Sequence, residues 1–191
     1  MRRNERGAAL VEFALVTPVL LILTLTAWEF TLIWLRNQAV INASQSAARA
    51  AAQAGTAEEA DQAAVRAAKA ALGDRWDRID RIVIYALDSD GSTPAACVDL
   101  ATRTSPGGAR CNVYTQPDVV QADDAAHFSC GGGAASNWCP TTRNGDLLSA
   151  DWLGVRVDYN DTWVSNVVPW GSYTLADTTV MRIEPRVDPN P

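Results

Sequence analysis

The sequence contains little of what catalysis requires. It has one histidine, His127, and no spacing that pairs a nucleophile with a base or sets two carboxylates in a cleft. The glycine run at 131–133 lacks the Lys-Ser/Thr pair that makes a glycine-rich loop a phosphate site. We therefore expect no enzyme activity and no cofactor. His127 is interpreted as a solvated loop residue, and the glycine run as a linker.

Signals for nucleic acid and for metal are also missing. The net charge is −6, and there is no Lys/Arg-rich run or stacking-aromatic pattern, which argues against a nucleic-acid partner. No cysteines form a CxxC pair, and zinc sites need closer ligands than these. The acidic segment 88–91 lacks the other ligands of a calcium loop and is better interpreted as a solvated turn. The sequence predicts no metal site.

Four cysteines lie in one Gly/Ser/Thr/Asp-rich segment: Cys97, Cys111, Cys130 and Cys139. An even number in such a segment fits two disulfides and an oxidising compartment. Three pairings are possible. Because shorter loops close at lower entropic cost, we expect Cys97–Cys111 and Cys130–Cys139.

A long apolar run occupies the N-terminus. The stretch Phe13–Trp28 carries no charge, and residues 8–35 exceed the roughly 20 residues that span a bilayer. Arginines in residues 1–7 predict a cytoplasmic N-terminus and an extracytoplasmic C-terminal domain. Glu12 and Glu29 then fall near opposite edges of the hydrocarbon layer. A cleaved signal peptide would have a shorter apolar core, and a plain membrane anchor would not explain Glu12.

Two helices are expected after the membrane segment. Residues 36–54 are rich in Ala, Gln and Arg, so one helix should run from the membrane to about residue 53. Thr56 and Glu59 form a capping-box pattern before a second helix over 57–72, which Gly73 should end. The Ala-rich faces fit either an ordinary surface helix or a smooth surface for neighbouring subunits.

The remainder is expected to form a small antiparallel sheet. Residues 81–88 and 153–160 are predicted strands, and one or two more are expected between Tyr173 and Ile183, after a turn at Pro169. The alternation in the second strand puts Val155, Val157 and Tyr159 on one buried face, against residues 82–86 and the helical stem. Residues 89–150 are too polar for a core and should be irregular structure held by disulfides. The fold class is therefore α+β.

The N-terminus resembles that of TadE-like proteins, the minor pilins or pseudopilins of the tight-adherence (Tad) system in the type IV pilin-like class. The resemblance rests on a basic leader ending at Gly7, the Glu12–Phe13 pair, the Thr17–Pro18 break and the Trp28–Glu29–Phe30 sequence. It covers about the first 55 residues, with support from the last 40. The cysteine-rich middle matches nothing specific.

This resemblance implies a structural subunit. A prepilin peptidase would cut between Gly7 and Ala8 on the cytoplasmic side and leave the apolar helix on the protein. Subunits would then contact other pilin-like subunits and the assembly machinery through the Glu12–Phe13 region, with Glu12 facing the Ala8 amine of a neighbour. Pro18 lacks an N–H, so the helix either bends there or tolerates a membrane proline.

The predicted organisation is a leader at 1–7, a membrane helix at 8–35, a helical stem and second helix at 36–73, and a β-rich domain at 80–191 with its cysteine-rich loop at 89–150. The protein is expected in the cytoplasmic membrane, and in a surface pilus after assembly. Two alternatives stay open: a secretion-type pseudopilin that never forms a surface fibre, and a monomeric membrane-anchored binding domain.

Overall fold

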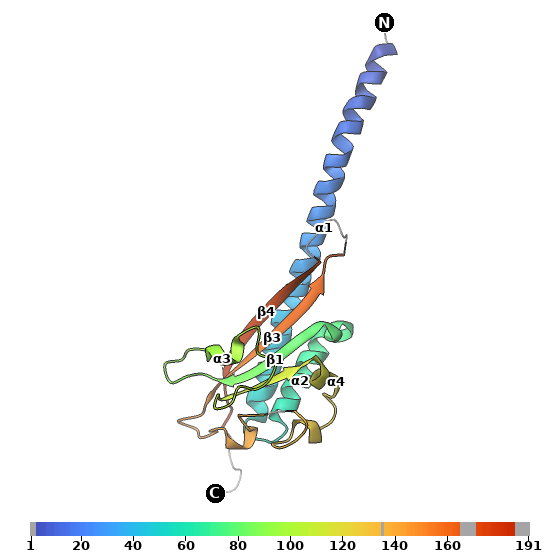
Figure 1. The fold of residues 1–191 in the computed structure, drawn as a ribbon. Coiled ribbons are helices and arrows are strands. Elements are labelled where there is room, and N and C mark those ends of the chain that lie inside the picture. Colours follow the sequence, from blue (N-terminus) through green and yellow to red (C-terminus); the bar gives the residue numbers. More distant parts are fainter. Residues whose placement is uncertain (1–2, 135, 165–170, 186–191) are drawn as a thin grey trace.

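A computed structural model describes residues 3–134, 136–164 and 171–185, and its long N-terminal helix projects from a compact α+β domain (Figure 1). The main elements are α1 (Arg3–Ala54), α2 (Ala60–Leu72), a 3-10 turn η1 (Gly73–Arg78), β1 (Ile79–Ala86), β2 (Cys111–Thr115), β3 (Trp152–Thr162) and β4 (Ser172–Arg182). Shorter pieces are α3 (Ala95–Val98), α4 (Gln116–Val120), η2 (Ala126–Phe128) and η3 (Pro140–Thr142). The predicted α+β class is confirmed.

The helix ends were predicted with mixed success. Helix α1 ends at Ala54, because Gly55 adopts a positive φ of 60° that a side chain would strain. Gly73 ends α2 in the same way, with a φ of 56°. The predicted capping box is wrong: α2 begins at Ala60, and its N-cap residue Glu59 makes no side-chain cap hydrogen bond.

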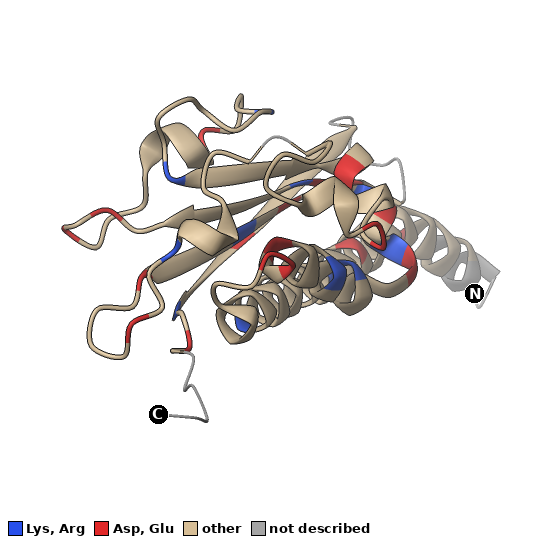
Figure 2. Ribbon diagram, turned by 90° about the horizontal axis from the view of Figure 1, so that it is seen from below, with Lys and Arg blue, Asp and Glu red and all other residues tan. Residues whose placement is uncertain are grey.

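The four strands form one antiparallel sheet in the order β2-β1-β3-β4. Val157 lies opposite Ile82, and Val155 lies opposite Ile84. These side chains and Tyr159 are buried in the main core, so the predicted inward face of β3 is confirmed. Helices α1 and α2 cover this face, as the two layers in Figure 2 show. The predicted turn at Pro169 lies outside the described residues.

The Ala-rich helix faces pack within the chain. The buried alanines of α1 and α2 all have at most 3% exposure: Ala43, Ala47, Ala48, Ala51, Ala52, Ala60, Ala64 and Ala68. Small side chains let two helices and a sheet approach closely. This is the packing of an ordinary surface helix, with one face on its own domain, and these buried alanines are not free to contact neighbouring subunits.

Residues 89–150, the cysteine-rich loop, are called the insertion below. Its first part covers the other face of the sheet over β1 and β2. Val83 and Tyr85 pack there against Cys97, Cys111 and Val113. The Tyr85 ring lies over β3, and a Cβ added to Gly154 would come within 2.3 Å of it. Glycine is therefore required at this position of β3.

The expectation that residues 89–150 contribute no core is wrong. Strand β2 belongs to this segment, and its Tyr114 joins Phe128 and Trp138 in the main core. The disulfides are Cys97–Cys111 and Cys130–Cys139, as predicted. The segment has few large apolar residues, and part of this set, including Tyr114, Phe128 and Trp138, is buried, whereas Leu147 and Leu148 are exposed.

A buried ion pair ties this insertion to α2. Asp61 and Arg143 pair with both side chains fully buried. Asp61 also accepts hydrogen bonds from Asn112 Nδ2 at 2.6 Å and from the Tyr114 hydroxyl at 2.7 Å. The Arg143 guanidinium lies 4.3 Å from the centre of the Trp138 ring. Burial, and then the Asp61 carboxylate, raise the pKa of Tyr114 well above its usual value, which keeps the phenol a donor.

A second buried pair lies on the opposite face. Arg81 Nε donates to Asp158 Oδ2 at 2.6 Å, and both side chains are fully buried. Arg81 also donates to the carbonyl oxygens of Val98, Asp99 and Thr102. The alternation in β3 puts Asp158 on the face opposite Val157, and the loop that contains Val98, Asp99 and Thr102 covers it there.

Candidate assembly interface

The N-terminal half of α1 is apolar and has no partner among the described residues. The helix Ala9–Ala54 contains an 18-residue window long and apolar enough to cross a membrane, and none of that window is buried. Its large side chains are exposed around the whole helix, including Phe13 at 69% and Leu23 at 60%. This segment is a candidate membrane span, which is consistent with membrane anchoring.

The predicted cleavage and contact residues lie at the start of this helix. Gly7, Ala8 and Glu12 are helical, and Glu12 is the only charged residue between Gly7 and Trp28. A Cβ added to Gly7 would meet no atom within 4 Å, so the fold of the described chain does not require glycine there. Glu12 and Phe13 are both exposed.

Helix α1 continues through Pro18 without a break. Proline cannot donate to the carbonyl of Ala14, four residues earlier. The Thr17 hydroxyl donates to Phe13 O at 2.7 Å, so it contacts the neighbouring carbonyl and not the one that Pro18 leaves free. The structure therefore shows a proline tolerated within a continuous helix.

A polar contact joins α1 to the tip of the β3–β4 hairpin. Glu29 is only 4% exposed, and its Oε2 accepts a hydrogen bond from Val164 N at 3.4 Å. Two turns later, Arg36 Nε lies 3.1 Å from Asp161 Oδ2. Arg36 also donates to the Tyr173 hydroxyl. The domain therefore begins to hold α1 at Glu29, within the range predicted to span the membrane.

Sequence reasoning missed the role of Glu29 and Arg36 as contacts to the sheet. Their spacing of seven residues places both on one helix face, which is the signal that could have found them. Tyr159 belongs to the same group, since its hydroxyl donates to Asp161 Oδ2 at 3.3 Å. Burial, and then the Asp161 carboxylate, raise the pKa of Tyr159 to about 12.

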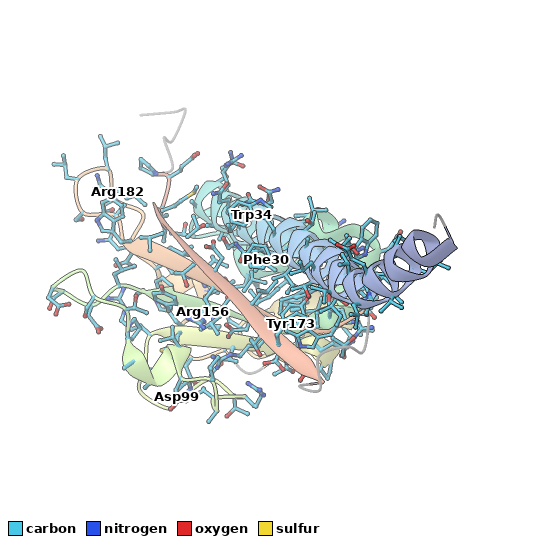
Figure 3. All side chains as sticks on the ribbon, turned by 90° about the horizontal axis from the view of Figure 1, so that it is seen from above. Phe30, Trp34, Asp99, Arg156, Tyr173 and Arg182 are labelled. Atoms are coloured by element: carbon cyan, nitrogen blue, oxygen red, sulfur yellow. A yellow bond between two sulfur atoms is a disulfide. The ribbon has the colours of Figure 1, made fainter. Side chains whose placement is uncertain are left out.

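The opposite face of α1 stays apolar beyond Glu29. Phe30, Trp34 and Leu35 are 69%, 59% and 57% exposed, whereas the next outward residues are Gln38 and Asn42. Figure 3 looks toward the domain from the N-terminal side and shows Phe30 and Trp34 on this helix. The exposed apolar surface of α1 thus extends alongside the first contacts with the domain.

His127 is not a solvated residue. Its side chain is 10% exposed, and Nε2 lies 2.8 Å from Asp118 Oδ1. Asp118 Oδ2 also accepts from the backbone N of Thr115 at 2.7 Å, so the pair fixes the start of α4. Within the described ranges, no three His, Cys, Asp or Glu side chains come together as metal ligands.

A protein-family model described as TadE-like protein matches residues 7–49. Residues 7–49 are a TadE-like segment. The match begins at the predicted cleavage residue Gly7 and ends within the part of α1 that packs on the sheet. It confirms the resemblance over these residues and supports association with a Tad pilus system. No curated protein and no solved structure matches the chain.

Proposed function

We propose that this TadE-like protein is a minor pilin or pilus-assembly protein of a Tad-type pilus. A prepilin peptidase cuts it between Gly7 and Ala8, and α1 packs with other pilin-like subunits. The observation that carries this proposal is the position of the TadE-like match. Residues 7–49 include the half of α1 whose apolar surface is exposed on every side and whose one charge before Glu29 is Glu12.

Such a helix requires an apolar environment in each state of the protein. Before assembly, the bilayer supplies it, because residues 9–28 form about 30 Å of helix. After assembly, the helices of neighbouring subunits supply it. The protein therefore lies in the cytoplasmic membrane, with its domain outside, until it is incorporated.

Glu12 sets the height at which two helices meet. A lone carboxylate is costly near a bilayer. Cleavage creates an amine on Ala8, which lies about 6 Å from Glu12 along the helix axis. A neighbouring subunit shifted along the axis brings its amine against Glu12, and this pair favours one axial register.

The proposed role is structural and not enzymatic. A secretion-type pseudopilin would use the same helix contacts but would form no surface fibre. A monomeric anchored domain would keep residues 1–7 and would make no helix contacts. Processing separates the monomeric anchored domain from the proposal, and incorporation into surface pili separates the secretion-type pseudopilin.

The experiment is to express Glu12→Ala in cells that assemble the pilus. Membrane insertion and cleavage should stay near parental levels, while the amount in sheared pili or in the purified assembly complex should fall sharply. Glu58→Ala is the matched control, since Glu58 is an exposed glutamate in the turn between α1 and α2. Parental incorporation of Glu12→Ala would remove the register role.

A further inference from the structure

A cleft of about 700 Å³ opens at the end of the sheet. Leu87, Trp152 and Val180 line it together with the loops at 88–91 and 149–151. Asp151 at its rim accepts a hydrogen bond from Ile183 N, and the next residue, Glu184, donates from its backbone N to Ala52 O near the C-terminal end of α1. The cleft therefore lies near this end of α1 and is remote from the membrane segment. Ala52 lies 23 residues after Glu29, or about 35 Å along the helix.

Trp152 is the main apolar surface of this cleft. It is the first residue of β3 and lies opposite Arg182 on the face of the sheet that α1 and α2 do not cover. Its side chain is 55% exposed, and Val180 beside it is 39% exposed. An indole offers a large flat apolar face and one N–H donor, and it usually finds a partner for both.

The rim of the cleft contains both donors and acceptors. Arg110 Nη2 lies 2.8 Å from Asp151 Oδ1, and Asp151 Oδ2 accepts from Asn144 N at 2.9 Å. Asp90 accepts from Ser92 N at 2.9 Å. The Asp88 carboxylate makes no hydrogen bond or ion pair with any described residue. Arg110, Asp151 and Asp90 are therefore held in place, and the Asp88 carboxylate keeps its full acceptor capacity.

We propose that this cleft binds a saccharide, with one face of a sugar ring on Trp152 and the ring hydroxyls on the rim. A sugar has an apolar C–H face and an edge of hydroxyls that both donate and accept, which matches this lining. A wholly apolar ligand would desolvate the carboxylates without replacing their hydrogen bonds. A cationic peptide would leave the face of Trp152 without a ring, and it is the competing ligand in the test below. The volume is in the range of ligand pockets and admits more than one ring.

This proposal does not depend on the role in pilus assembly, since the cleft and the N-terminal half of α1 lie at opposite ends of the protein. The test uses the full chain in a detergent without a sugar headgroup. Neutral trisaccharides of glucose, galactose and N-acetylglucosamine are titrated, with binding followed by saturation-transfer NMR and tryptophan fluorescence.

We expect at least one of these trisaccharides to bind. Trp152→Ala should weaken that binding by about tenfold or more, and Trp152→Phe should weaken it less because a ring remains. Asp88→Asn should weaken it without changing thermal unfolding. Trp34→Ala is the matched control, since Trp34 is an equally exposed tryptophan outside the cleft, and it should bind as the parent does.

Three results would overturn the proposal. One is that no trisaccharide gives a signal at millimolar concentration. Another is binding that persists in a folded Trp152→Ala variant. The third is binding of triarginine, lost in Asp88→Asn, with no binding of any sugar, which would make the cleft a site for cationic peptides.

Discussion

The buried Asp61–Arg143 pair allows a sharp test of how the insertion is held. Asp61→Asn keeps the size of the side chain and an acceptor oxygen, but it removes the charge that balances Arg143. Arg143 is fully buried, and its Nε and Nη1 have no hydrogen-bond partner in the described chain. Breaking a buried pair from one side costs about 3–5 kcal/mol. For a chain of this size, that lowers the melting temperature by roughly 6–20 °C.

The assay is thermal unfolding of the full chain in detergent, followed by circular dichroism. Asp123→Asn is the matched control, because Asp123 pairs with Arg66 at 3.3 Å with both side chains mostly exposed. That variant should lose about 1 kcal/mol or less. Asp61→Leu combined with Arg143→Met should recover much of the stability. If Asp61→Asn melts with the parent, the insertion is not anchored through this pair.

Three further predictions concern the domain. Replacing Cys97 and Cys111 together by Ala should cost about 3 kcal/mol, because their sequence separation is 14, and non-reducing peptide mapping of the parent should recover this pair. Val157→Asp should cost several kcal/mol in a denaturant titration, because Val157 is fully buried, whereas Thr178→Asp on the exposed face of β4 should resemble the parent. Because the pKa of Tyr159 is raised to about 12, folding favours the neutral phenol, so stability should fall as the pH rises from about 10 towards 12. Melting curves across that range should show a shallower fall for Tyr159→Phe, and an equal fall would contradict the assignment.

Local sequence pattern predicted the elements that depend on local causes. The length of α1, the glycine that ends α2 and the inward face of β3 follow from helix propensity, positive φ and alternation. The two ion pairs could not be predicted this way, because Arg143 lies 82 residues from Asp61, and Asp158 lies 77 residues from Arg81. Composition likewise predicted an irregular insertion. It could not show that Tyr114, Phe128 and Trp138 join the main core, because that depends on contacts formed only in the folded chain.

The residues of the candidate assembly interface also fall into two groups: those that a local pattern predicts and those that depend on contacts distant in the sequence. Glu12 and Pro18 were found because a charge and a proline stand out in an apolar helix. The sequence alone placed Glu29 at the membrane edge. Its contact with the domain could not be predicted, because its partner Val164 is 135 residues away. The contact between Arg36 and Thr162 likewise spans 126 residues. Both acids lie in one helix, but only Glu29 is covered by the domain.

The N-terminal residue of the protein extracted from membranes tests the central claim most directly. Protein from cells with an active prepilin peptidase should begin at Ala8, and protein from cells without this peptidase should begin at Met1. Gly7→Arg should keep the leader in both strains, because the peptidase needs a small residue before the cut. The fold itself places no demand on this position, so the variant should still fold. An intact leader in the presence of active peptidase would contradict the account and would favour a plain membrane anchor.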